Sequence, residues 1–438
     1  MDPPAAHAPR GSDRGAVAPA SSAADLSTGG LAALFGPGRP RDPYPLYRQL
    51  RRDHPVWQPL EGLFVLTRHR DCAAVLRDPH LGHADAGPRT ARRRGRRRSL
   101  SPTSGEGRAA ARSFLLMDPP DHTRLRRLVS RSFTARRVEE LAPRVRALTG
   151  ELLSAAVEQE AVDLVAALAS PLPVTVISEL LGVPPEDRER LVGWSHALAR
   201  SIEPAISVPD AERVDQVRAR EELATYLREL VDARRRSPGD DLVSALVRTR
   251  DEGDALSEDE LVGTCVLLLV AGHETTTSLI ANGVLALLRH PDQLARLRSD
   301  PGLVGGAVEE LARYDPAVQL TMRTALEETA VAGTAVPRGA VVLAILGAAN
   351  RDPEAFPDPE RLDVVRPPSP HLAFGQGIHF CLGAPLARLE AGVALRALTQ
   401  DVADIELAAD PEWKDTAVLR GVARLDVRLS ARGARRAS

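Results

Sequence analysis

The sequence predicts a single domain that is mainly α-helical with a smaller β portion. Apolar residues recur with helical spacing over residues 121–250, interrupted mainly at prolines. A further helical segment follows Ser257 and runs for roughly 33 residues, about 50 Å at the helical rise, which is long enough to cross a whole domain. Short segments with strand character lie outside these two regions. No internal repeat or linker separates folded halves, so we expect one domain over residues 29–430.

Both ends of the chain are predicted to lie outside this domain. Residues 1–28 are rich in Ala, Pro, Ser, Gly and Asp, and residues 431–438 form a short Arg/Ala tail, so we expect both to be disordered. Residues 1–30 lack the apolar segment of a signal peptide. The net charge of −2 predicts no nucleic-acid partner, and an apolar run of only Cys265–Ala271 in the long helix predicts no membrane span. The few cysteines fit a reducing cytoplasm.

The first ordered elements are short. A helix is predicted from Asp42 to Leu50, a hairpin over Val56–Thr67, and a helix from Arg70 to Arg77 that Asp78-Pro79 stops. Residues 83–112 form a basic, irregular loop, and charge runs of this kind are usually solvated and mobile. A second hypothesis is that this loop recognises an acidic group.

The remaining elements follow from caps and periodicity. The long helix begins with a capping box, Ser257 to Glu260, and ends before Pro291, which cannot continue it. Helix is predicted again over 292–314, short strands follow up to residue 350, and an alternating strand closes the chain at 425–429.

The segment FGQGIHFCLG, residues 374–383, is the most informative in the chain. It puts Cys381 on a glycine-rich loop directly before a helix, and a helix N-terminus favours the thiolate that a metal requires. Gly375, Gly377 and Gly383 let the backbone approach a large flat ligand, and Phe374 and Phe380 can shield the sulfur from water. A dinucleotide fingerprint is excluded because Phe380 stands at the third glycine position. Together with Cys72 and Cys265, Cys381 makes an odd, sparse set of three cysteines, which argues against a disulfide framework.

The pattern F-G-x-G-x-H-x-C-x-G resembles the haem-ligand loop of the cytochromes P-450, with Cys381 as the axial thiolate and metal ligand. The resemblance extends from about Asp42 to Leu429 and is closest to soluble bacterial members that modify secondary metabolites such as polyketides. It implies the P-450 fold, with haem b held between the long central helix and the helix after the cysteine loop. It also implies a monooxygenase that inserts one oxygen atom of O₂ into a hydrophobic small molecule, by hydroxylation or epoxidation.

The middle of the long helix, residues 271–276, reads AGHETT. Ala271 and Gly272 are small enough for a ligand to approach the backbone, and Thr275 can bond back to the carbonyl of Ala271 and open the helix. The segment resembles the family's oxygen-binding motif, which implies that Glu274 and Thr275 are catalytic and relay protons. A zinc-protease motif is excluded because Thr277 replaces the second histidine.

The resemblance also implies contacts to the haem propionates. His122 and Arg126 share one helix face, and Arg323 and His379 match two further family positions. The cofactor-binding residues are therefore expected to be His122, Arg126, Ala271, Gly272, Arg323, Phe374, Gly375, His379, Cys381 and Gly383.

A second, structural motif is the E-x-x-R pair, Glu310 and Arg313, whose i, i+3 spacing puts both charges on one helix face. The resemblance adds Arg361 as the third partner of this pair, in a triad that supports the cysteine loop.

Electrons are implied to come from NAD(P)H through a ferredoxin reductase and ferredoxin. Arg124, Arg127 and Arg131 form the expected docking face for an acidic ferredoxin, because basic surfaces attract acidic partners. The expected substrate-lining residues are Leu268, Ala271, Val318 and Leu320. A further hypothesis is that the basic loop 83–112 recognises an acidic carrier protein or a substrate carboxylate. A peroxide-driven peroxygenase and a non-catalytic haem-binding protein are the alternatives for function.

Overall fold

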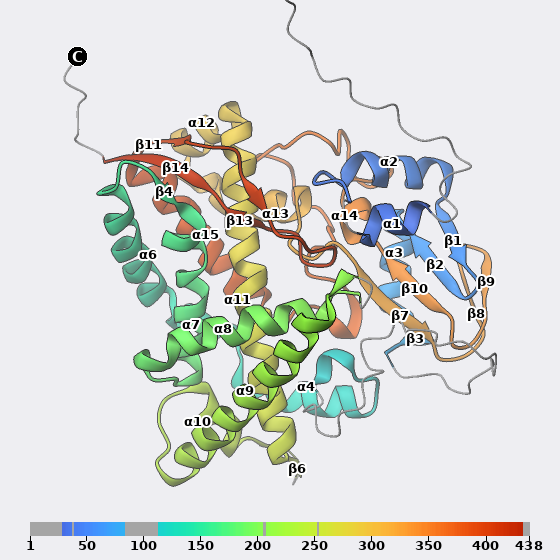
Figure 1. Ribbon diagram of the computed structural model, residues 1–438, viewed down its shortest axis with the longest axis horizontal. Coiled ribbons are helices and arrows are strands. Elements are labelled where there is room, and N and C mark those ends of the chain that lie inside the picture. The colour runs from blue at the N-terminus through green and yellow to red at the C-terminus, as the bar shows by residue number, and fades with distance from the viewer. Residues whose placement is uncertain (1–28, 37–38, 84–112, 205–206, 252–253, 432–438) are drawn as a thin grey trace, which may run out of the picture.

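The computed structural model describes residues 29–431 except 37–38, 84–112, 205–206 and 252–253. The expectation of a mainly helical protein with small sheets is confirmed (Figure 1). The helices are α1 (Gly29–Phe35), α2 (Tyr44–Asp53), α3 (His69–Arg77), α4 (Asp121–Ser132), α5 (Ala135–Glu140), α6 (Ala142–Val157), α7 (Pro171–Leu181), α8 (Arg188–Ala199), α9 (Asp210–Arg236), α10 (Leu242–Arg248), α11 (Glu258–Arg289), α12 (Pro291–Ser299), α13 (Val304–Tyr314), α14 (Leu346–Ala349) and α15 (Ala384–Gln400). The strands are β1 (Val56–Leu60), β2 (Leu63–Leu66), β3 (Leu81–Gly82), β4 (Val162–Asp163), β5 (Arg250–Asp251), β6 (Asp254–Ala255), β7 (Thr321–Ala325), β8 (Thr329–Val331), β9 (Thr334–Val336), β10 (Val341–Ala344), β11 (Val402–Leu407), β12 (Glu412–Trp413), β13 (Val422–Arg424) and β14 (Asp426–Ala431).

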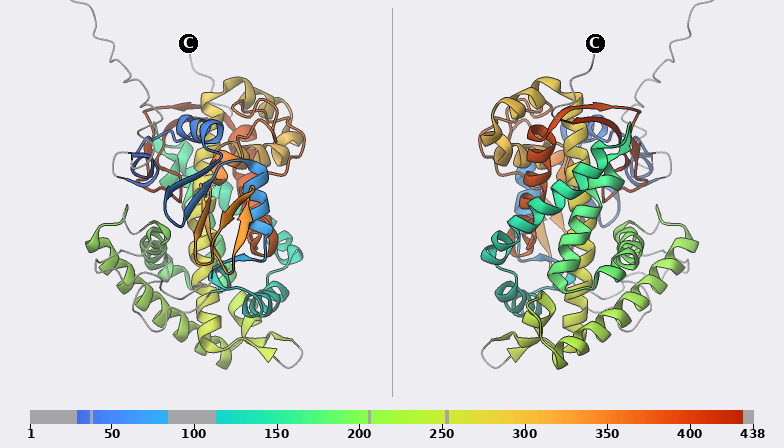
Figure 2. Two further views of the ribbon diagram at one scale, coloured as in Figure 1. Left: turned by 90° about the vertical axis from the view of Figure 1, so that its right-hand side faces the viewer. Right: turned by 90° about the vertical axis from the view of Figure 1, so that its left-hand side faces the viewer.

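Helix α11 is the axis around which the other elements pack (Figure 2). The predicted capping box is present: the Ser257 side chain accepts from the Glu260 amide, and the Glu260 side chain accepts from the Ser257 amide. The helix ends at Arg289, before Pro291 opens α12. Among the described residues α11 is the one helix long and apolar enough to cross a membrane, and 67% of its apolar window is buried inside the protein. Such burial is what the central helix of a globular core requires.

The β portion lies beside the helices as a five-stranded sheet of order β1-β2-β10-β7-β3. The predicted hairpin over 56–67 forms its edge, with Trp57 opposite Val65 in an antiparallel pair. A smaller sheet of order β11-β14-β4 contains the predicted closing strand. Apolar side chains of both sheets are buried, so the strands are held by packing as well as by their ladders.

One predicted helix is wrong in extent. Residues 292–314 form two helices, α12 and α13, separated by a short turn at Pro301–Leu303. Pro301 has no amide hydrogen for the helix ladder, and the Asp300 carboxylate accepts from the Gly302 amide at 2.9 Å. Asp300 and Pro301 therefore mark the break between the two helices, and a prediction from the spacing of apolar residues alone overlooks them.

The third partner of the E-x-x-R pair is also different from the predicted one. Glu310 and Arg313 pair at 2.7 Å in the interior, and the second guanidinium opposite Glu310 belongs to Arg366, at 3.0 Å. Arg361 lies with its side chain exposed, and it contributes only its carbonyl oxygen, which accepts from both Arg313 and Arg366. Between the two arginines the backbone turns at Asp363, whose amide donates to the Glu310 carboxylate at 2.9 Å and whose carbonyl accepts from the Arg366 amide at 2.9 Å. This turn lies beside Glu310 and brings the Arg366 side chain to it.

Candidate functional site

The cysteine loop leads directly into α15, as predicted. Gly375 and Gly377 have φ of +69° and +71°, a conformation that favours glycine. A side chain at Gly377 would lie 2.4 Å from the Leu76 carbonyl oxygen, so the loop packs tightly on α3. The Cys381 amide donates to the Phe374 carbonyl at 2.9 Å. The loop is thereby closed into a defined turn with the sulfur at the start of α15.

The electrostatics of Cys381 differ from the simple helix-terminus expectation. Burial raises the pKa of its thiol, while the amides of Gly383 and Ala384 and the charge of Arg126 oppose that effect. A thiolate at this position therefore benefits from a cation bound at the sulfur itself. The other two thiols are fully buried in apolar clusters, and burial raises their pKa further, to about 12 for Cys265. Cys381 is thus the cysteine best placed to hold a metal.

Behind the loop, a polar network fixes the aromatic side chain next to the cysteine. The Arg388 guanidinium lies 4.4 Å from the centre of the Phe374 ring and pairs with Glu309 at 2.6 Å. His371 reaches the other oxygen of Glu309 at 3.1 Å. Phe374 is held in place beside the loop, whereas Phe380 is 40% exposed.

The four predicted propionate residues come together from three separate segments. The His122 ring on α4 lies 4.3 Å from the His379 ring on the cysteine loop, measured between centroids. Arg126, one turn after His122, donates to the Phe380 carbonyl at 2.5 Å. Arg323 on β7 is 4% exposed and donates to the Met322 carbonyl at 2.9 Å.

Sequence reasoning missed one member of this cluster. The His83 ring lies 4.8 Å from the His379 ring, just after β3, and the His83 amide donates to the Asp118 carboxylate at 3.0 Å. A lone histidine after a short strand carries no motif, so no sequence signal pointed to it. The sheet places it there because β3 pairs with β7, the strand that carries Arg323.

The cluster combines two cations, Arg126 and Arg323, with three imidazole rings that burial keeps neutral. Burial, together with the nearby positive charges, lowers the pKa of His83 and of His379 to about 3, and burial lowers that of Arg323 to about 10. Both ring nitrogens of His122 and the Nε2 of His83 are buried without a hydrogen-bond partner in the described part of the chain. Unsatisfied buried donors are costly, and a dianionic ligand would satisfy them. The cluster therefore fits the two carboxylates of a haem.

On α11, the predicted bond from Thr275 back to Ala271 is present, within a helix that runs unbroken from Glu258 to Arg289. The Thr275 hydroxyl donates to the Ala271 carbonyl at 2.6 Å, and Ala271 is exposed although it lies in the middle of the central helix. A side chain at Gly272 would meet only Ile177, at an ordinary 3.6 Å, so packing between protein segments does not require a glycine there. Small side chains over an exposed stretch of a central helix are suited to a bound ligand.

Glu274 has two partners that the sequence did not reveal. Its Oε1 accepts from Nε2 of His196 on α8 at 2.9 Å, and its Oε2 pairs with Nζ of Lys414 at 2.6 Å. Burial alone would raise the pKa of the Glu274 carboxyl, but the His196 hydrogen bond and the Lys414 charge hold it far below its usual range. Lys414 is the only lysine in the sequence, which is the one signal that could have drawn attention to it.

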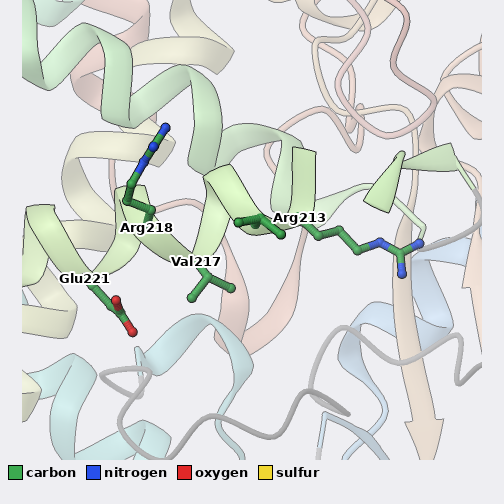
Figure 3. A pocket seen from close by; sticks show the side chains of 5 residues that line it. Arg213, Val217, Arg218 and Glu221 are labelled. Carbon is green, nitrogen blue, oxygen red and sulfur yellow. The ribbon is translucent and has the colours of Figure 1, made fainter. Parts of the chain in front are cut away.

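The predicted substrate-lining residues have different environments. Ala271 is exposed and Val318 is half-buried, while Leu268 and Leu320 are 8% and 7% exposed and belong to two different apolar clusters. A surface hollow of about 440 Å³ lies elsewhere, along the first turns of α9 (Figure 3). It is lined by Arg213, Val214, Val217, Arg218 and Glu221, and none of these was predicted.

The three arginines of the predicted ferredoxin face have different environments. Arg127 and Arg131 are exposed on α4. Arg124 is half-buried and pairs with Asp254 at 3.1 Å and also with Glu260. Arg124 therefore ties α4 to the segment that opens α11 and offers less of its charge to a partner. Residues 84–112, which contain most of the predicted basic loop, lie outside the described residues.

The chain is similar to known proteins in both sequence and fold. A sequence model of the family Cytochrome P450 matches residues 91–301 and 302–401. Cytochrome P450 monooxygenase PikC of Streptomyces venezuelae is 45% identical over 399 residues, which cover 88% of this chain and 91% of that protein. The 6-deoxyerythronolide B hydroxylase of Saccharopolyspora erythraea is 48% identical over 317 residues, 71% of this chain and 76% of that protein. The crystal structure of P450BioI in complex with hexadec-9Z-enoic acid ligated acyl carrier protein superposes with a TM-score of 0.81, at 34% identity over 92% of this chain and 100% of that one.

Proposed function

The chain belongs to the cytochrome P450 family and is a haem-dependent monooxygenase, and we propose that it hydroxylates or epoxidises a hydrophobic, polyketide-type metabolite with electrons from a ferredoxin. The observation that carries this proposal is the intact acid–alcohol pair on α11, Glu274 and Thr275, next to the exposed Ala271. A peroxide-driven peroxygenase or a passive haem carrier would not need a proton-delivering pair there, since neither consumes O₂ and external electrons.

We propose that the residues around the cysteine loop hold haem b. Cys381 supplies the sulfur ligand, and His122, Arg126, Arg323 and His379 supply donors for the propionates, with His83 beside them. Ala271 and Gly272 on one side, and Phe374, Gly375 and Gly383 on the other, leave room for the flat ring. When bound, the haem supplies the iron at which O₂ is activated.

Around that group, the protein's own residues position substrate and protons. Thr275 turns its hydroxyl to the Ala271 carbonyl, which frees that carbonyl from part of its helical bonding and leaves space for water in the helix. Glu274 is held as a carboxylate by His196 and Lys414, so it accepts and passes on protons rather than carrying one permanently. The pair therefore serves as the last two groups of a proton path.

The proposed substrate class is supported by a relative's named substrate and by the apolar character of the proposed lining residues. One relative is named for the hydroxylation of 6-deoxyerythronolide B, and the proposed lining residues Leu268, Ala271, Val318 and Leu320 are all apolar. Val214 and Val217 on α9 are 70% and 57% exposed, which is unusual for valine and suits a route for an apolar molecule.

The proposed electron donor is supported by basic residues on α4, and the proposed carrier protein by a structural relative. Arg127 and Arg131, with the partly engaged Arg124, offer a basic face for an acidic ferredoxin that delivers electrons from NAD(P)H. An acidic carrier protein is a second candidate partner, because a structural relative binds an acyl carrier protein. We place the enzyme in the cytoplasm, where NAD(P)H and ferredoxin are reduced.

The proposed substrate class is tested with the purified holoenzyme and 6-deoxyerythronolide B. Binding is expected to shift the haem from low to high spin, and a surrogate plant-type [2Fe–2S] ferredoxin with its NADPH reductase is expected to give a product heavier by one oxygen atom. As a matched control, hydrogen peroxide replaces the ferredoxin system. Product formed with peroxide but not with ferredoxin would favour the peroxygenase alternative, and a spin shift with no oxidation in either case would favour a binding protein.

A further inference from the structure

His196 and Lys414 together enclose the catalytic acid from two elements far apart in the sequence. The carboxylate of Glu274 is 7% exposed, and each of its oxygens has its own cationic partner: Oε1 meets His196 and Oε2 meets Lys414. The His196 side chain is 56% exposed, so one end of this ion triad lies in solvent while the other lies beside Thr275.

From this geometry we propose that His196 is the residue through which protons pass from solvent to Glu274, with Lys414 as the positioning residue. This proposal rests on the proposed monooxygenase function, since it concerns the protons that the reaction consumes. An imidazolium at His196 donates its Nε2 proton to Glu274 Oε1 and is reprotonated from water, and Glu274 passes the proton toward Thr275. Each turnover takes up two protons, two electrons and O₂ and releases one water with the oxidised product.

The position of His196 is fixed by reciprocal contacts between adjacent residues on α8 and α11. The Ser195 hydroxyl lies 3.0 Å from Nδ1 of His273, while the next residue on each helix forms the His196–Glu274 pair. The His196 and His273 rings are also stacked, with an angle of 14° and a centroid separation of 5.4 Å. Helix α8 crosses α11 near its middle, which brings these pairs into register (Figure 1).

His273 itself is not suited to carry the proton. It is completely buried, and its second nitrogen, Nε2, lies 3.0 Å from the Ser170 hydroxyl, so both ring nitrogens are occupied. Burial lowers the pKa of His273 to about 4, although Glu274 opposes the effect. His273 therefore acts as a neutral platform for the ring of His196.

Lys414 is suited to holding the acid rather than to exchanging its proton. A lysine keeps its proton at neutral pH, whereas histidine is the side chain whose charge ordinarily changes between about pH 5 and 8. An arginine fork would engage both carboxylate oxygens, but the single ammonium takes Oε2 and leaves Oε1 to His196. Every other basic residue of the chain apart from histidine is arginine, so Lys414 is the single position with an ammonium side chain.

The loop that carries Lys414 is itself tied to the end of α8. Its Asp415 carbonyl accepts from Arg200, just after α8, at 2.5 Å, and the Asp415 carboxylate pairs with Arg39 at 2.6 Å. Arg200 also pairs with Glu212. Within the described part of the chain, the His196 ring pairs with Glu274 and stacks on His273. Lys414 lies on the other oxygen of Glu274, and Arg200 follows His196 by one helical turn.

The test compares H196Q with the wild type, and uses H80Q as a matched control. His80 is 52% exposed and also pairs with carboxylates, Asp78 and Glu327, but lies away from α11. Product per NADPH from 6-deoxyerythronolide B is measured from about pH 6 to 8.5, with peroxide release in parallel. We expect product per NADPH to fall as pH rises in the wild type and in H80Q. In H196Q we expect it to be about tenfold lower than in the wild type at the acid end, and to change little with pH.

Two further measurements separate proton transfer from a structural role. H196K keeps a positive donor opposite Glu274 that does not titrate near neutrality, and it should have the flat profile of H196Q. An infrared difference spectrum against E274Q reports the carboxylate of Glu274 directly, and we expect its band to shift in H196Q and not in H80Q. A wild-type pH profile in H196Q or H196K, or an unshifted band, would refute the proposal. If the wild type gives no product at all, the substrate proposal fails, while peroxide release and the infrared band still test the role of His196.

Discussion

Replacing Arg366 with methionine is predicted to destabilise the protein strongly, although no motif marks this residue. Its side chain is 10% exposed and donates to both oxygens of Glu310, at 3.1 and 3.0 Å, and to the Pro357 carbonyl at 2.6 Å. Breaking a buried ion pair leaves an uncompensated charge and costs about 3–5 kcal/mol. Arg313 remains opposite Glu310, so the carboxylate keeps one partner. We therefore expect R366M to lose about 3 kcal/mol in the free energy of unfolding, at the lower end of this range.

The matched control is R361M, five residues earlier. Arg361 contributes only its backbone carbonyl to the network, and its side chain is exposed, so a loss within about 0.5 kcal/mol is expected. Urea unfolding of both variants, followed by circular dichroism and compared at equal m value, gives the difference in the free energy of unfolding. Equal losses in the two variants, or a larger loss in R361M, would show that the buried triad has been assigned to the wrong arginine.

Three other perturbations test the site. T275A should retain haem binding but release about tenfold more peroxide per NADPH, because the hydroxyl that positions protons is lost, and unchanged coupling would argue against the acid–alcohol pair. The double change R127E/R131E should weaken ferredoxin affinity and make its salt dependence shallower without altering substrate binding, and unchanged reduction kinetics would move the docking face elsewhere. The haem-free protein should lose stability as pH falls below about 6.5, because the folded-state pKa values of His83 and His379 lie near 3, so the unfolded chain binds protons first. H83Q should reduce that acid sensitivity, and an identical pH dependence in H83Q would contradict the assignment.

The elements that were predicted correctly carry local signals. The capping box of α11 and the hairpin of β1 and β2 are read from neighbouring residues, and the cysteine loop from its glycine spacing. The Thr275–Ala271 bond follows likewise from a four-residue separation on one helix. Such features depend on short-range geometry, which a sequence displays directly.

The features that were missed depend on contacts between distant segments. His196 reaches Glu274 from α8, and Lys414 reaches it from the turn after β12, across 140 residues of chain. His83 joins the propionate cluster only because β3 pairs with β7. Arg366 takes the place predicted for Arg361 because the backbone between them turns against Glu310 at Asp363. No periodic pattern in the sequence predicts these long-range contacts, because they depend on how the sheet and the helices pack.

The central claim is that Cys381 is the sulfur ligand of a haem. The most direct measurement is the absorption spectrum of the ferrous–CO complex of the wild type, C381S and C265S. A thiolate ligand gives a strongly red-shifted Soret band, so the account predicts this band in the wild type and in C265S, whose sulfur is buried in the apolar core, and its loss in C381S. A red-shifted band that persists in C381S would contradict the account.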